Sequence, residues 1–240
     1  MRYGSLTHEQ ARHYRSQGYY RLPRVYNEGE VAELRQFVSR EFAKAVGQRT
    51  LKLYGLYDRE PELMHRAITN PVLAGALESL LGPNIIFVKN RHNHATINSA
   101  TGLPSEGLHR DILQPTRGLL TALIYLDNST AENGATRLIP GSHEMPYVGV
   151  PQANGGGTWM TEHEEFGGME DQAIGVPMPA GGVLLFNGLV FHGVGANTNG
   201  HPRASITLGF RSADELDAQP DASRQVIVLG EQPYRGNDIL

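Results

Sequence analysis

A change of hydrophobic pattern at residue 85 restricts the fold more than any other feature of this sequence. Before it, apolar residues recur every three or four positions, as on amphipathic helices. After it, short runs rich in β-branched and aromatic residues alternate with turn residues. Helices followed by many short strands are typical of a β-sandwich or jelly roll with a helical layer. We therefore expect a mainly β fold buttressed by N-terminal α-helices.

The N-terminal part carries clear helix boundaries. Thr7 and Gln10 have the spacing of a capping box, and Gly18 is a natural end for the helix that follows. Pro61 and Pro71 each stand at the first turn of an apolar segment, where proline is favoured. The predicted helices span residues 8–17, 28–45, 61–68 and 71–81, with a short strand at 19–22.

The C-terminal part contains the predicted strands and one long connection. The connection from Glu144 to Met178 has two glycine runs and no clear pattern, so we interpret it as a lid-like insertion. No repeat or linker divides the chain, so we predict a single domain over 1–240, with a helical buttress at 1–84 and a β core at 85–229. The predicted strands span residues 85–97, 109–111, 118–126, 179–187, 189–195, 203–210 and 224–229.

Composition argues against several classes of function. The net charge is −4 and no basic run is present, which argues against nucleic acid as a partner. The absence of cysteine excludes disulfides, thiolate metal sites and a cysteine nucleophile, and fits a cytoplasmic location. No apolar stretch reaches the ~20 residues of a membrane span, so we expect no membrane partner.

The segment Gly107–Asp111 brings a histidine and an aspartate together just ahead of a long β-type run. Side chains alternate across a strand, so His109 and Asp111 would share one face while Arg110 occupies the other. An imidazole beside a carboxylate supplies two of the three ligands in the 2-His-1-carboxylate triad of non-haem Fe(II) proteins. The third ligand would be a distant histidine on another inward-facing strand.

His192 lies in an apolar strand and meets that demand. A turn at residues 197–200 predicts a hairpin in which His192 pairs with residue 203 or residue 205. Either register leaves Arg203 and Ser205 on the face of His192. An arginine beside a metal ligand needs an anion, and a dicarboxylate cosubstrate would supply one through a bidentate contact.

These motifs together resemble the phytanoyl-CoA dioxygenase family. The resemblance covers most of the chain and adds Gly18-Tyr19-Tyr20 near the N-terminus. The residues that carry it are His109-Arg110-Asp111, Asn133-Gly134, Ile139-Pro140-Gly141-Ser142-His143, Ala180-Gly181 with Val183–Phe186, His192, Asn197 and Pro202-Arg203. The resemblance implies a double-stranded β-helix, a cupin-like jelly roll, which uses Fe(II), 2-oxoglutarate and O2.

The resemblance also implies roles for individual residues. His109, Asp111 and His192 would bind iron, and Arg203 would bind the distal carboxylate of 2-oxoglutarate. Some members place a serine two residues after the distal histidine, where this chain has Val194, and Ser205 could supply that contact instead.

Two further assignments come from Arg91-His92-Asn93, which resembles an Arg-x-Asn in ectoine hydroxylases of the family. That match would put Asn93 on 2-oxoglutarate and Arg91 on the substrate side. Without it, an ordinary polar strand face explains both residues equally well. Trp159 could pack on an apolar face of the substrate, or be anchored in a side cluster of a surface insertion.

The implied reaction is hydroxylation of an unactivated C–H bond in a small metabolite or natural-product intermediate, with release of succinate and CO2. Desaturation, epoxidation and cyclisation are alternatives on the same cofactors. Halogenation is disfavoured because Asp111 fills the position that a halide would need. A non-catalytic jelly-roll binding protein is the alternative from another class. Phytanoyl-CoA itself is disfavoured by the lack of a basic cluster for the CoA phosphates, and the oligomeric state is not readable.

Overall fold

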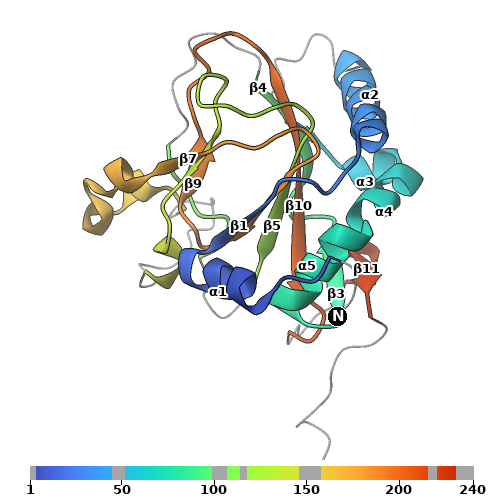
Figure 1. Ribbon diagram of the computed structural model, residues 1–240, viewed down its shortest axis with the longest axis horizontal. Coiled ribbons are helices and arrows are strands. Elements are labelled where there is room, and N and C mark those ends of the chain that lie inside the picture. Colours follow the sequence, from blue (N-terminus) through green and yellow to red (C-terminus); the bar gives the residue numbers. More distant parts are fainter. Residues whose placement is uncertain are drawn as a thin grey trace, which may run out of the picture.

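Two antiparallel sheets facing each other form the body of the protein (Figure 1). The computed structural model describes residues 4–44, 52–98, 107–113, 118–145, 158–215 and 221–230. The larger sheet has eight strands in the order β1-β8-β5-β10-β3-β11, with β2 and β4 joined beside β10. The smaller sheet has the order β7-β6-β9. The expected jelly roll, a double-stranded β-helix with a helical buttress, is confirmed.

The strands are β1 (Tyr19–Leu22), β2 (Lys52–Tyr54), β3 (Ile85–Val88), β4 (Asn93–Asn98), β5 (Leu120–Tyr125), β6 (Thr136–Leu138), β7 (Ile174–Val176), β8 (Val183–Asn187), β9 (His192–Val194), β10 (Arg203–Ser212) and β11 (Gln225–Leu229). The α-helices are α1 (His8–Gln17), α2 (Glu28–Lys44), α3 (Leu56–Arg59), α4 (Pro61–Ile68) and α5 (Pro71–Leu81). Short 3-10 helices are η1 (Ser142–Glu144), η2 (Met160–Glu162), η3 (Glu164–Phe166), η4 (Met169–Gln172) and η5 (Ala222–Arg224).

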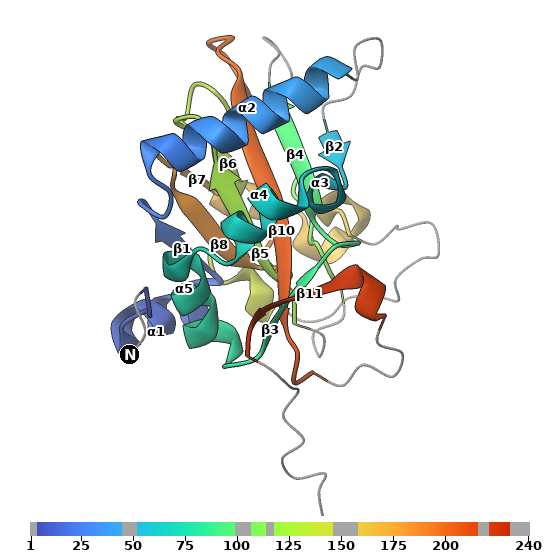
Figure 2. The ribbon, with the colours of Figure 1, turned by 90° about the vertical axis from the view of Figure 1, so that its right-hand side faces the viewer.

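The N-terminal helices form where their local signals predict them. The capping box of α1 is present, with Thr7 accepting from the Gln10 amide and Gln10 accepting from the Thr7 amide. Gly18 ends α1 at φ 77°, a left-handed conformation that suits glycine. Figure 2 shows α2, α4 and α5 in front of the larger sheet, and their apolar faces share one core with it.

Strand β10 separates the helical core from the space between the sheets. It pairs with β5 on one side and with β4 and β3 on the other. Its alternating side chains give Ile206 and Leu208 to the helical core, while Arg203 and Ser205 face the smaller sheet. One central strand therefore serves the hydrophobic core on one face and a polar pocket on the other.

The strand predicted over residues 85–97 is two strands, and that prediction is corrected. Residues 89–92 leave the ladder as a bulge between β3 and β4, and both strands pair with β10. His92 takes a left-handed φ of 53°, and its carbonyl accepts a hydrogen bond from the Gly209 amide at 3.0 Å. In β4 the even-numbered His94 and Thr96 line the pocket, whereas Ala95 joins the helical core.

The hairpin predicted between His192 and Arg203 is also wrong. Strand β9 pairs with β6 in the smaller sheet, whereas β10 pairs within the larger one. The turn joins strands that cross from one sheet to the other, as the jelly-roll topology requires. His192 and Arg203 therefore face each other across the sandwich instead of lying side by side.

The connection 144–178 has more structure than its sequence indicated. Its described residues include η2, η3, η4 and strand β7, which completes the smaller sheet. Residues 146–157, which include the first glycine run, lie outside the described part of the chain. Nowhere in the described ranges is a helix both long and apolar enough to cross a bilayer.

Candidate metal centre and its pocket

Three side chains from separate parts of the chain meet between the two sheets. One ligand-type atom from each of His109, Asp111 and His192 lies within 4.8 Å of the others. The Asp111 Oδ1 atom is 4.0 Å from His109 Nε2 and 3.6 Å from His192 Nε2. Two imidazoles and one carboxylate in a half-closed pocket form the donor set that non-haem iron uses.

The two histidines are held by their main chains. The His109 amide donates to the His192 carbonyl and the His192 amide donates to the His109 carbonyl, each at 2.9 Å. A segment outside the regular strands is thereby pinned to β9, and the two imidazole centroids lie 4.5 Å apart. The Nδ1 atom of His192 is 2.9 Å from the Val190 carbonyl, which fixes a tautomer with a free Nε2.

The protonation states of these side chains fit a cation. Burial, and then the neighbouring His192, lower the pKa of His109 to about 4, so its imidazole is neutral at pH 7. Burial alone would raise the pKa of Asp111, but the nearby His192 and His92 and a hydrogen bond from Thr121 hold it well below its usual range. Asp111 is therefore ionised, and the neutral His109 imidazole beside it can bind a metal without first losing a proton.

Arg203 and Ser205 line the same pocket as the three metal-type ligands. Arg203 is only 2% exposed, and its Nε and Nη1 atoms have no hydrogen-bond partner among the described residues. Its guanidinium carbon lies 5.5 Å from the centre of the Tyr125 ring, and burial lowers its pKa. A buried cation without an acidic partner is costly, so the pocket is built for an anion.

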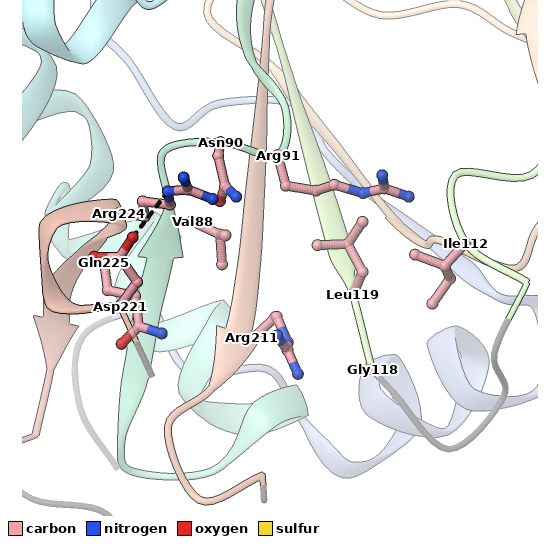
Figure 3. A pocket seen from close by; sticks show the side chains of 10 residues that line it. All are labelled: Val88, Asn90, Arg91, Ile112, Gly118, Leu119, Arg211, Asp221, Arg224 and Gln225. Atoms are coloured by element: carbon pink, nitrogen blue, oxygen red, sulfur yellow. Dashed lines mark ion pairs between the residues drawn. The ribbon is translucent and has the colours of Figure 1, made fainter. Parts of the chain in front are cut away.

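Asn93 and Arg91 do not reach this pocket, which corrects the placement expected for both. The Asn93 Oδ1 atom accepts from the Tyr57 amide at the start of α3, at 3.0 Å. Arg91 donates to the main-chain carbonyl of Asp111 and lines a second cavity, where its side chain extends toward Ile112 (Figure 3). The inward positions of β4 belong to the even-numbered His94 and Thr96, so Asn93 shares the opposite face with Ala95, which packs in the helical core.

Trp159 lies against the metal-type cluster. Its ring centroid is 4.8 Å from that of His109, and its side chain is 40% exposed. Other pocket residues had not been foreseen, and they are Lys52, His92, His94, Thr96, Leu123, Thr136, Phe186 and Thr207. The sequence did carry a signal for these residues, because the polar His92, His94 and Thr96 alternate along the predicted strand. The Arg-x-Asn match instead placed the odd-numbered residues, Arg91 and Asn93, in the pocket.

The fold and this cluster define a class: jelly-roll proteins with a 2-His-1-carboxylate site. The family model described as "Phytanoyl-CoA dioxygenase (PhyH)" matches residues 14–205, most of the chain. The chain belongs to the phytanoyl-CoA dioxygenase family.

Relatives of known name fall in the same group. Dioxygenase trt7 of Aspergillus terreus is 33% identical over 182 residues, which cover 70% of this chain and 56% of that protein. The peroxisomal phytanoyl-CoA dioxygenase of Bos taurus is 23% identical over 193 residues, covering 75% and 57%. The chain thus spans about half the length of these curated relatives.

Solved structures share the fold at low identity. The alpha ketoglutarate dependent epimerase SnoN from nogalamycin biosynthesis superposes with a TM-score of 0.70 at 20% identity, covering 93% of this chain and 96% of that one. EctD from S. alaskensis with bound Fe superposes with a TM-score of 0.70 at 20% identity, covering 90% and 80%.

Proposed function

We propose that this protein is an Fe(II)- and 2-oxoglutarate-dependent oxygenase that acts on a small molecule. His109, Asp111 and His192 would hold the iron from one side and leave the remaining positions for cosubstrate and O2. The type and placement of these three donors, and the ionisation of His109 and Asp111, support the assignment. Family membership and a relative named "Iron/alpha-ketoglutarate-dependent dioxygenase ausU", 32% identical over 111 residues, point the same way.

The single observation that carries this proposal is the buried guanidinium of Arg203 in the same pocket. A dicarboxylate bound to the metal at one end would bring its other carboxylate to Arg203, which has unused donors there. Ser205, 3% exposed and one inward position further along β10, would add a hydroxyl contact. Asn93 has no part in this proposal, because its side chain accepts a hydrogen bond from the Tyr57 amide outside the pocket.

When bound, iron, 2-oxoglutarate and O2 together would supply the oxidising power for attack on an unactivated C–H bond. The chain's part is to hold, orient and exclude water. Phe186 packs on His192 at 4.4 Å between ring centroids, which gives the cluster an apolar flank. Trp159 would cover His109 on the side open to solvent, and we propose that it contacts substrate.

We propose hydroxylation of a small metabolite or natural-product intermediate as the outcome. Structural neighbours titled as an epimerase and a carbocyclase make epimerisation and cyclisation the alternatives to test. We further propose that residues 1–240 act as one catalytic domain.

The test is 2-oxoglutarate turnover by anaerobically iron-loaded protein, with succinate and CO2 measured against a panel of candidate small molecules. Succinate formation that requires iron, and that a panel member stimulates, is the expected result. Asp111→Ala serves as the inactive control. Stoichiometric iron binding without any succinate would overturn the proposal and favour a binding protein.

A further inference from the structure

We propose that the bulge at residues 89–92 is built to orient Asp111, and that His92 is the positioning residue in it. This inference rests on the proposed function, because it concerns the carboxylate assigned to iron. The imidazole of His92 places Nε2 3.1 Å from Asp111 Oδ1. His92 matches no motif used above, and it adds a third imidazole to a cluster that already has its three ligand-type side chains.

Asp111 needs positioning that the two histidine ligands do not. His109 and His192 exchange main-chain hydrogen bonds with each other, so backbone pairing fixes their places. Asp111 lies in a bend outside the ladder of either sheet, where its amide donates to the Gly188 carbonyl at 2.7 Å. Its carboxylate must therefore be held by side chains.

Two side chains approach the carboxylate from different directions. Thr121 Oγ1 on strand β5 donates to Oδ2 at 2.7 Å, whereas His92 Nε2, from the bulge, makes a close polar contact with Oδ1 that lacks hydrogen-bond geometry. The guanidinium of Arg91, one residue earlier, donates to the main-chain carbonyl of Asp111. Successive bulge residues thus bind the main chain and the side chain of one ligand. These contacts restrict both the translation and the rotation of the carboxylate.

The bulge is a built feature of the fold. His92 is the only non-glycine residue in the described ranges with a positive φ, 53°, a conformation disfavoured for side chains with a Cβ. A Cβ on Gly209 of β10 would lie 2.6 Å from the Arg91 carbonyl. The bulge can therefore pass this close to β10 only because residue 209 is glycine. Bulges are common beside active sites, and the side chain of His92 in this one lines the metal pocket.

The experiment measures metal affinity without turnover. The full chain is titrated with Co(II) under argon, and both the dissociation constant and the visible absorption of bound Co(II) are recorded. The variants are His92→Leu, which removes the imidazole, and His92→Gln, whose amide can reach the position of Nε2. His201→Leu is the control, because it removes an exposed imidazole that does not line the pocket.

We expect His92→Leu to weaken Co(II) binding about 10- to 100-fold, as loss of a group that orients a metal ligand does, and to shift the visible spectrum. His92→Gln should recover most of the affinity, and His201→Leu should bind like the wild type. Unchanged affinity in His92→Leu, or an equal loss in His201→Leu, would overturn the proposal. Failure of His92→Gln to recover any affinity would do the same.

A second pair of variants separates backbone strain from the contact. His92→Gly and His92→Ala both lack the imidazole, but only alanine has the Cβ that makes the left-handed backbone unfavourable. Metal-free His92→Gly should melt at a higher temperature than His92→Ala, and both should bind Co(II) weakly. Equal melting temperatures would contradict the strained bulge. Wild-type protein that binds Co(II) but never turns over 2-oxoglutarate would overturn the proposed function and leave this inference standing.

Discussion

The two walls of the pocket are built in different ways. The wall from the larger sheet carries Arg203 and Ser205 on β10, a ten-residue strand paired on both sides and backed by the helical core. The opposite wall carries His192 on a three-residue strand, and His109 joins it through a single bridge. Strand pairing and core packing hold the larger wall without any ligand, whereas a metal ion would add cross-links to the smaller one. The anion end of the site is therefore preformed, and the metal end depends more on its ligands.

Removing a metal ligand should have the largest effect. His109→Ala, Asp111→Ala and His192→Ala should each weaken iron binding by at least ~100-fold, beyond the loss typical of groups behind the ligands. Turnover of 2-oxoglutarate should fall to background, while far-UV circular dichroism stays unchanged because the large wall is independent. His201→Ala, an exposed histidine, is the control. Stoichiometric iron with full turnover in any of the three would remove that residue from the ligand set.

Arg203 tests the other wall. Arg203→Leu should raise the 2-oxoglutarate KM or Kd roughly 30-fold or more, because losing one side of a buried charge pair costs about 2–5 kcal/mol. Iron binding should change little, which is the signature of two separate walls. Arg211→Gln is a suitable control, because that arginine pairs with Glu215 away from the metal pocket. A parallel loss of iron in Arg203→Leu would show that the walls are coupled.

Acid should weaken the larger wall through His94. Burial, and then the neighbouring His92, lower the pKa of His94 to about 3, below the usual value of 6.5. Protonation therefore favours the unfolded chain. The stability this group contributes is full above about pH 6.5 and is lost as pH falls from there toward 3. At pH 5 the loss from this one group is about 1–2 kcal/mol.

Urea unfolding of metal-free protein at pH 7.5 and pH 5 measures that loss. His94→Gln should show a smaller drop between the two pH values than the wild type, since glutamine does not titrate. The exposed His201 again supplies the matched variant, His201→Gln. Identical pH dependence in wild type and His94→Gln would rule out His94 as the source.

The sequence could predict the features whose causes are local. Helices with local signals, such as the Thr7 capping box and the prolines of α4 and α5, formed where expected because their causes lie within one turn. His109, Asp111, His192 and Arg203 were grouped correctly, since motif spacing and residue chemistry carry that information. Their role as ligands stays a prediction.

The predictions that failed were those that depend on contacts with distant strands. The partner of β9 is β6, more than fifty residues away, and nothing near the turn at 197–200 encodes that choice. The bulge at 89–92 depends on a close approach to Gly209 of β10, which no signal within 89–92 encodes. The Arg-x-Asn match chose the wrong face of β4 for Asn93, and a one-residue change of phase turns every side chain of a strand to the other face.

Metal binding should protect the smaller wall selectively. Amide hydrogen exchange with and without Co(II) should slow in β6 and β9 and at His109, whose amides pair around the ligands. Exchange in β5 and β10 should change much less, because those strands are fixed already. Equal protection of both sheets would mean that the large wall also depends on metal.

Trp159 offers the smallest effect and the simplest measurement. It is the only tryptophan of the chain, and its ring lies 4.8 Å from the His109 ring, so all tryptophan fluorescence comes from beside the proposed metal. Co(II) should quench that emission with the same dissociation constant that calorimetry gives, and Asp111→Ala should abolish the saturable quenching.

Trp159→Leu should leave metal affinity within about threefold of the wild type, because the ring touches a ligand but supplies no donor atom. If the ring also contacts substrate, the KM of a turned-over molecule should rise in Trp159→Leu while the 2-oxoglutarate KM stays constant. Unchanged values of both would assign Trp159 to packing on the smaller wall and remove it from the substrate site.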